Sequence, residues 1–270
     1  MSDRNLTSRC ISVADNNLVG TMPKEIVGLS GLLRLDVNDE KFGPALRTIS
    51  GNLASLESLS FRGSSKGRIP SEIGLLTSLT SLYLSAPTTE DLTGSLPTEL
   101  GKLALLQELV VLDHNLATHL PTELFLLTKL TTLSLSTGNT GSIAGSIPSE
   151  VGALSNLRVL NLRGVGSLIW VPNQMGDLSN LEVLDLEDSF FSRWHGEEVE
   201  VIPSVFGSLM NLKELYLRTC HEIKSASFEF AFSVLFALHS FMTALTISFS
   251  IFPQTTITYA APFLNPSLTW

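Results

Sequence analysis

The chain has 270 residues, of which 44% are hydrophobic and only 16% are charged, and this balance excludes an intrinsically disordered protein. Its formal net charge is −9 and it contains no Lys/Arg-rich run, whereas nucleic-acid binders need basic residues to neutralise phosphates. Nucleic acid is therefore not an expected partner. The chain begins with a polar tail, residues 1–8, and residues 1–17 contain no apolar segment of the kind that a signal peptide requires.

A six-residue pattern, L-x-x-L-x-L, begins at residue 32 and recurs at intervals of 23 to 31 residues. The alternation of apolar and polar residues at its end is typical of a short strand with one buried face. Because a single unit cannot bury its leucines alone, stacked units must share one continuous core. With a partial copy at Ile11 and Val13, the pattern predicts nine units. The complete copies begin at Leu32, Leu56, Leu79, Leu106, Leu130, Leu157, Leu181 and Leu212.

An apolar residue followed by proline comes after most of these strands. Proline fixes φ and is tolerated where a helical turn begins, so each such pair predicts a short turn that returns the chain towards the next strand. The pairs are Met22-Pro23, Ile69-Pro70, Leu96-Pro97, Leu120-Pro121, Ile147-Pro148, Val171-Pro172 and Ile202-Pro203. A glutamate often follows within the turn, where a negative charge favours a helix N-terminus. This position explains Glu72, Glu99, Glu123 and Glu150 without paired catalytic carboxylates.

The repeated unit resembles that of plant-type leucine-rich-repeat proteins, such as receptor-like ectodomains and polygalacturonase inhibitors. LTGSLPTELGKL at 92–103 and IAGSIPSEVGALSNLRVLNL at 143–162 carry the resemblance. It implies an α/β repeat fold, a leucine-rich-repeat solenoid of about nine repeats. The parallel sheet would form the concave face, and short helical or 3-10 turns the convex face. We assign residues 9–224 to this solenoid.

The turns after the strands depart from the family pattern, in which a buried asparagine bonds to backbone groups at each turn. Asn16 fits that pattern. The equivalent positions in the later units are Glu40, Ser64, Pro87, His114, Gly138, Val165, Ser189 and Cys220. An unpaired buried backbone group costs about 1–3 kcal/mol. We therefore expect irregular turns in which other groups replace the asparagine.

Side chains that alternate with the buried leucines should point into the concave face. Solenoids use such a face for binding, and Tyr and Arg are over-represented at the centres of protein interfaces. We predict that this face binds a protein or peptide, or alternatively a glycan; the competing interpretation is a solvated face that keeps the protein soluble. The predicted contacts are Asp36, Arg62, Tyr83, Glu108, Asn161, Arg163, Asp185, Glu187, Tyr216 and Arg218.

The longest insertion, DSFFSRWHGEEVEV at 188–201, follows the strand of the eighth unit. Aromatic and basic side chains in an exposed loop are candidate contacts for a partner. Phe191, Arg193 and Trp194 are therefore a second predicted group of contacts. The alternative is that the loop folds back and shields its own rings.

No motif of a known catalytic class is present. The sequence contains no nucleophile elbow, P-loop or kinase motif. Its five histidines lack the spacing of a metal site. We therefore predict a non-catalytic recognition scaffold, with no enzyme activity, no cofactor and no metal. The resemblance implies a receptor-like role in signalling or defence, with inhibition of a secreted glycan-degrading enzyme as the alternative.

Residues 225–270 form a hydrophobic C-terminal segment with a different composition. The apolar run at 230–252 is long enough to cross a bilayer. Three interpretations fit it: a transmembrane anchor, a cap over the last repeat, or sequence that is not native to the protein. The anchor is the favoured interpretation; it would make the membrane a partner and place the repeats on the cytoplasmic side.

Overall fold

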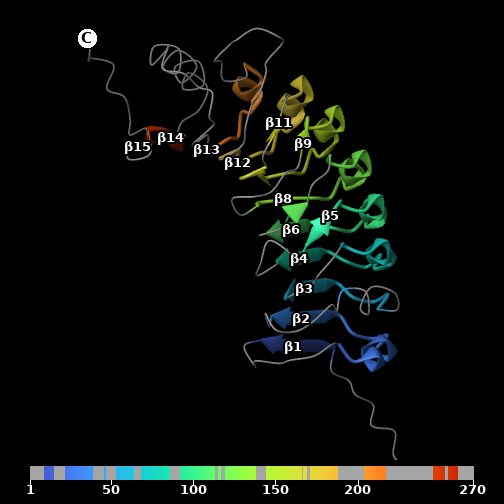
Figure 1. Cartoon of the computed structure of the whole chain (residues 1–270). Helices are drawn as coiled ribbons and strands as arrows, with labels where there is room; N and C mark the ends of the chain where they lie inside the picture. The colour runs from blue at the N-terminus through green and yellow to red at the C-terminus, as the bar shows by residue number, and fades with distance from the viewer. Residues whose placement is uncertain are drawn as a thin grey trace, which may run out of the picture.

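The computed structural model describes residues 9–14, 22–38, 46, 53–63, 68–85, 92–112, 115–116, 119–137, 144–165, 167–168, 171–187, 204–216, 246–252 and 255–260. The chain forms a curved stack of repeats (Figure 1). Strands line its inner side and short helices line its outer side. This arrangement is the leucine-rich-repeat solenoid that the sequence predicts.

Nine parallel strands form the repeating part of the sheet, one for each predicted unit. The strands pair in register, so that equivalent leucines face one another; Leu82 of one strand, for example, lies beside Leu109 of the next. The strands are β1 (Cys10–Ala14), β2 (Arg34–Asn38), β3 (Ser58–Arg62), β4 (Ser81–Ser85), β6 (Glu108–Leu112), β8 (Thr132–Ser134), β10 (Val159–Asn161), β12 (Val183–Asp185) and β13 (Glu214–Tyr216).

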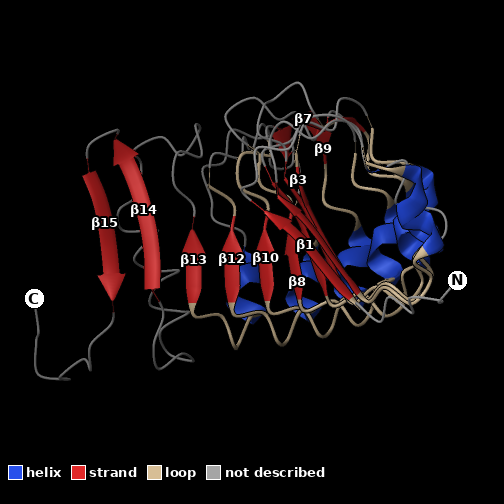
Figure 2. Cartoon of the chain, turned by 90° about the horizontal axis from the view of Figure 1, so that it is seen from below, coloured by secondary structure: helices blue, strands red, loops and turns tan. Residues whose placement is uncertain are grey.

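Among the described residues, seven 3-10 helices of five residues lie together on one side of the sheet, the convex side (Figure 2). They are η1 (Lys24–Gly28), η2 (Ser71–Leu75), η3 (Thr98–Lys102), η4 (Thr122–Leu126), η5 (Ser149–Ala153), η6 (Asn173–Asp177) and η7 (Ser204–Ser208). Proline caps η1 to η6, with φ between −58° and −74°. Its carbonyl accepts the first amide of the turn, as from Leu100 to Pro97 at 3.1 Å. The proline therefore precedes the helix instead of occupying its first turn.

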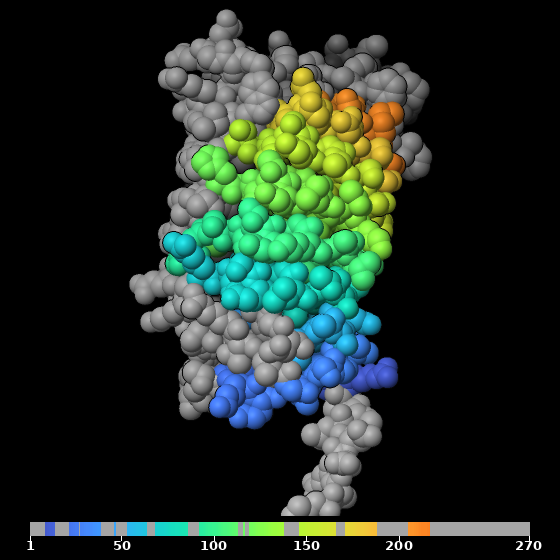
Figure 3. All heavy atoms as spheres, turned by 90° about the vertical axis from the view of Figure 1, so that its right-hand side faces the viewer, coloured from blue at the N-terminus to red at the C-terminus, as the bar shows by residue number. Residues whose placement is uncertain are grey.

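The core lies between the strands and the 3-10 helices. Each repeat contributes leucines that are almost completely buried, among them Leu82 and Leu109. The helices of adjacent repeats stack closely because of glycine: a Cβ atom on Gly101 would lie 2.6 Å from the carbonyl oxygen of Glu123. Viewed from the convex side, the repeats form successive layers (Figure 3).

Two short ladders lie at the edge where the strands end. β5 (Thr93–Gly94) pairs with β7 (Asn115–Leu116), and β9 (Ala144–Gly145) pairs with β11 (Ser167–Leu168). Of the positions where the family asparagine is replaced, Val165 alone belongs to the described residues, and it is buried. Beside it, the Thr137 hydroxyl donates to the Gly164 carbonyl, and the Gly164 amide donates to the Glu187 carbonyl at 2.8 Å. Neighbouring repeats thus supply the partners at this turn.

The sheet continues into the C-terminal segment. β14 (Thr246–Phe252) pairs in parallel with β13, with Ile247 beside Leu215, and β15 (Thr255–Ala260) pairs with β14 in the antiparallel sense. Residues 246–252 therefore form a strand, where a transmembrane anchor would require a helix. Within the described ranges, no helix has the length and apolar character needed to cross a membrane.

Candidate binding surfaces

The central positions of the strands present a column of side chains on the concave face. The parallel register places Tyr83 beside Val110 and Asp185 beside both Asn161 and Tyr216. The side chains of this column are half-buried, except for Ser134, which is buried, and their neighbours along each strand lie in the core. The column, here called the concave column, consists of Asp36, Ser60, Tyr83, Val110, Ser134, Asn161, Asp185 and Tyr216.

Polar contacts fix the C-terminal half of this column. The side-chain oxygens of Asn161 and Asp185 each accept the backbone amide two residues ahead, both at 2.9 Å. The Tyr216 hydroxyl donates to the Glu214 carboxylate at 2.9 Å. This hydrogen bond, with burial and nearby carboxylates, raises the pKa of Tyr216 above its usual value. Asp185 and the neighbouring Glu214 make the C-terminal half of the column acidic, and these hydrogen bonds orient its side chains before a ligand binds.

Glu187 differs from the other predicted contacts. It is only 5% exposed, and its carboxylate forms an ion pair with Arg163 at 3.2 Å. The guanidinium of Arg163 remains half-exposed. Burial thus favours a role for Glu187 in positioning Arg163, and a direct contact between Glu187 and a ligand remains a prediction.

The remaining predicted residues are more dispersed. Arg62 is exposed at the end of β3, and Glu108 is exposed at the start of β6, where it accepts the Ser81 hydroxyl at 3.1 Å. Asp36 accepts the hydroxyl of Ser12 at 3.3 Å near the N-terminal end of the sheet. The structure therefore brings the predicted contacts together mainly between β10 and β13. Arg218 and the insertion-loop residues Phe191, Arg193 and Trp194 lie outside the described residues.

A second polar surface lies at the edge of the sheet where the chain enters the strands. It is a groove of about 500 Å³, here called the lateral groove. Its lining is polar or charged at every position: Gln107, Lys129, Thr131, Asn156, Arg158, Asn180, Glu182 and Asn211. These residues occupy two equivalent positions of successive repeats, one of them just before the leucine that opens the pattern. The sequence analysis did not identify this surface.

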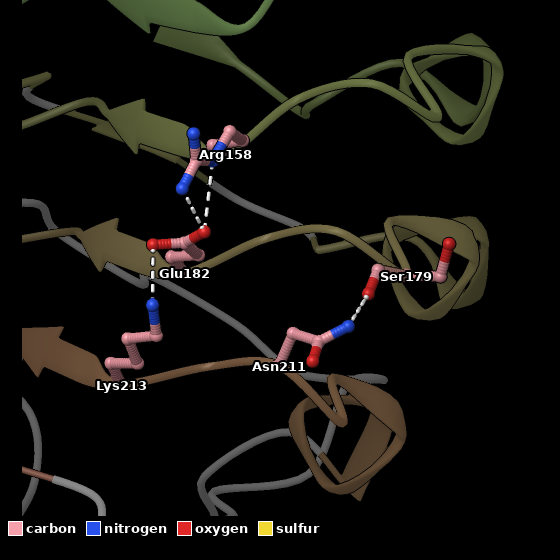
Figure 4. A network of polar contacts seen from close by, with 5 residues as sticks. All are labelled: Arg158, Ser179, Glu182, Asn211 and Lys213. Atoms are coloured by element: carbon pink, nitrogen blue, oxygen red, sulfur yellow. Dashed lines mark hydrogen bonds and ion pairs between the residues drawn. The ribbon is translucent and has the colours of Figure 1, made fainter.

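Three asparagines form a ladder along the lateral groove. The side-chain amides of Asn156, Asn180 and Asn211 each donate to a backbone carbonyl of the preceding repeat, at 2.8, 2.8 and 2.6 Å. Figure 4 shows the last of these bonds, from Asn211 to Ser179. Asn-Leu at the start of three consecutive patterns was the sequence signal for this ladder.

Charges of alternating sign run beside this ladder. Glu182 lies between two cations: Nε and Nη2 of Arg158 both donate to its Oε1, and Nζ of Lys213 donates to its Oε2 at 2.8 Å (Figure 4). The hydrogen bonds from Lys213 and Arg158 hold the pKa of Glu182 below its usual value of 4.5. The three residues come from consecutive repeats, so the contacts link β10, β12 and β13. Among the described residues, no cluster of His, Cys, Asp and Glu could hold a metal ion.

The family model described as a leucine-rich repeat region matches residues 83–256, more than half of the chain. The chain belongs to the leucine-rich-repeat family. The matched region extends past residue 224 and includes β14. Among curated proteins, the sequence comparison found no match.

Solved structures of similar fold include plant receptors and a bacterial protein. The plant peptide hormone receptor RGFR1, in complex with RGF2, is 26% identical over 90% of this chain and 39% of that chain, with a TM-score of 0.63. The Arabidopsis receptor kinase HAESA, in complex with the peptide hormone IDA and the co-receptor SERK1, is 24% identical over 78% of this chain and 34% of that chain, with a TM-score of 0.62. An internalin from Listeria monocytogenes is 23% identical over 78% of this chain and 57% of that chain, with a TM-score of 0.55. The last two show the fold alone, and this chain spans 57% or less of each of the three proteins.

Proposed function

We propose that the concave column binds an extended peptide segment of a protein ligand, without catalysis. The supporting observation is the in-register column from Tyr83 to Tyr216, which aligns one residue per repeat and leaves all of them but the buried Ser134 partly exposed. Similarity to RGFR1, which was solved with RGF2, supports a peptide as the ligand. As the resemblance to receptor-like proteins implies, the binding would serve recognition in signalling or defence.

The dimensions of the column set the length of the proposed peptide. Tyr83 and Tyr216 lie five strands apart, and neighbouring strands are about 4.8 Å apart, which gives roughly 24 Å. An extended peptide rises about 3.3 Å per residue, so roughly seven residues would cover this distance. The Asn161–Tyr216 end carries Asp185 and lies beside Glu214. We therefore expect a basic residue of the peptide to lie at that end, where opposite charges favour correct orientation.

A phage-displayed heptapeptide library, selected on the purified full chain, tests this proposal. Selected peptides should lose at least about 30-fold in affinity for Tyr216→Ala or Tyr83→Ala, because tyrosines that anchor a ligand contribute about 2 kcal/mol or more. Leu126→Ala is the matched control, since Leu126 is 65% exposed on the convex side. Peptides that bind both tyrosine variants as tightly as the original chain would place the binding site elsewhere. A library that yields no binder would contradict a peptide function.

For the C-terminal segment we propose the cap among the three interpretations. Pairing of β14 with β13 supports it, because β14 covers the strand edge that would otherwise be exposed after the last repeat. A chain ending at Lys224 should then unfold at a lower temperature than the full chain and associate more readily. Equal melting temperature and equal solubility would refute the cap. Recovery of the full chain alone in a membrane fraction would support the anchor instead.

A further inference from the structure

The lateral groove is separate from the concave column and has no part in the proposed peptide site. Its residues project from the segments that precede the strands, whereas the concave column projects from the strands themselves. Besides the three asparagines that bond to the backbone, its lining contains further polar and charged side chains, among them Lys129, Arg158 and Glu182. Arg158 and Lys129 are exposed residues of its lining.

The groove is a local concentration of positive charge on an acidic protein. The lining carries two cations, Lys129 and Arg158, and a single carboxylate, that of Glu182, which also pairs with Lys213 beside the groove, so cations outnumber carboxylates here. The chain as a whole carries −9. Charge complementarity therefore selects an anionic ligand at this place.

Arg158 retains donors for such a ligand. Its Nε and Nη2 point to Glu182, and its third guanidinium nitrogen points away from that carboxylate (Figure 4). Among the described residues, nothing accepts from that nitrogen, and the side chain is 58% exposed. Glu182 thus orients the guanidinium while leaving one face of it open for a carboxylate.

The neighbouring amides favour a peptide as the carrier of the anion. Asn156 and Asn180 each use one N–H on a backbone carbonyl, and within the described part of the chain no other hydrogen bond engages these amides. A carbonyl oxygen and a second N–H on each can pair with the amide groups of a peptide backbone. The lining contains no aromatic side chain on which a sugar ring could stack. We propose that the lateral groove binds an acidic peptide segment of a partner protein, whose carboxylates engage Arg158 and Lys129.

Binding of a fluorescein-labelled octaglutamate to the full chain, measured by fluorescence anisotropy, tests the proposal. The double variant Lys129→Gln/Arg158→Gln should bind about fivefold to tenfold more weakly, and added salt should remove the difference. Glu182→Gln should bind more tightly than the original chain, because it releases Arg158 and Lys213 from their common partner. Lys102→Gln is the control, since Lys102 is an exposed cation on η3.

Three further arms separate the competing explanations. Uncharged octaglutamine should not bind, and Tyr216→Ala should leave octaglutamate binding unchanged, which separates this groove from the concave column. Equal affinity of the double variant and the original chain would overturn the proposal. Weaker binding by Glu182→Gln would also overturn it and leave the charges a purely structural role. Tighter binding of an oligogalacturonate than of octaglutamate would overturn the peptide assignment in favour of a glycan.

Discussion

The buried and exposed sides of the same strands follow different rules. Leu35 is buried in β2, and the equivalent residue in every later strand through β13 is also leucine. One position further along the chain, on the concave face, the residue changes from acidic to small, aromatic, aliphatic or amide from one repeat to the next. Uniform packing thus specifies the stack of repeats, whereas the variable positions are free to specify a ligand.

This difference follows from what each side contacts. A buried leucine must fit between the equivalent leucines of two neighbouring repeats, so a change in its volume affects both interfaces. A side chain on the concave face meets solvent, and its replacement disturbs few neighbours. Function is therefore expected at the positions where the repeats differ most.

The strongest test of this comparison is Leu109→Ala in β6. Leu109 is completely buried between Leu82 and Leu133, so its truncation should lower the free energy of unfolding by about 2–5 kcal/mol. The measurement is chemical denaturation of the full chain. Leu126→Ala is the control and should change stability by less than about 0.5 kcal/mol, because Leu126 is exposed. Similar losses for both variants would show that burial does not separate the two classes.

A smaller effect is expected where two helices approach closely. A methyl group at Gly101 would lie 2.6 Å from the Glu123 carbonyl oxygen and force η3 and η4 apart. Gly101→Ala should therefore cost about 1–3 kcal/mol, as other overpacked substitutions do. Gly28→Ala is the matched control, because no atom of the described residues lies within 4 Å of a Cβ there. A neutral Gly101→Ala, measured by the same denaturation, would show that the convex helices can shift apart without cost.

The sequence allowed the repeating part of the molecule to be predicted, because periodic leucines reflect one local rule that applies in every unit. Burial of Glu187 was not predictable from that rule. Glu187 pairs with Arg163 of the preceding repeat, and the leucine period does not specify that ion pair. The alternation of apolar residues with Thr246, Ser248 and Ser250 is compatible with a strand, but the 32-residue step from Glu214 to Thr246 lacks the leucine pattern, so the pairing of β14 with β13 was not predictable.

The charged network of the lateral groove was missed because its residues lie far apart in the sequence. Arg158, Glu182 and Lys213 are isolated charges in the sequence, 24 and 31 residues apart, and carry no local motif. They become neighbours only because the repeats stack in register. Periodicity identified positions at which the same type of residue recurs. In this network the same position of each repeat is occupied in turn by a cation, an anion and a cation, so no residue type recurs.

The smallest expected effect concerns the pH dependence of stability at that network. Because Lys213 and Arg158 lower the pKa of Glu182, the folded protein binds this proton less readily than the unfolded chain does. Its stabilising contribution is therefore complete above the unfolded-state pKa and is lost as the pH falls through the lower folded-state value. Glu182→Gln should reduce the melting temperature slightly at pH 7, and the difference from the original chain should shrink as the pH is lowered past 4.5.

The matched control for that measurement is Glu57→Gln, at the equivalent position of the third repeat. Within the described residues Glu57 forms no ion pair, so its replacement removes a carboxylate without removing a network. A pH-dependent difference confined to Glu182→Gln would establish that the charged edge contributes to stability through its ion pairs. Equal behaviour of the two variants would mean that the exposed charges act only through the net charge of the chain. The charges at this edge would then differ from the core leucines in having no structural role of their own.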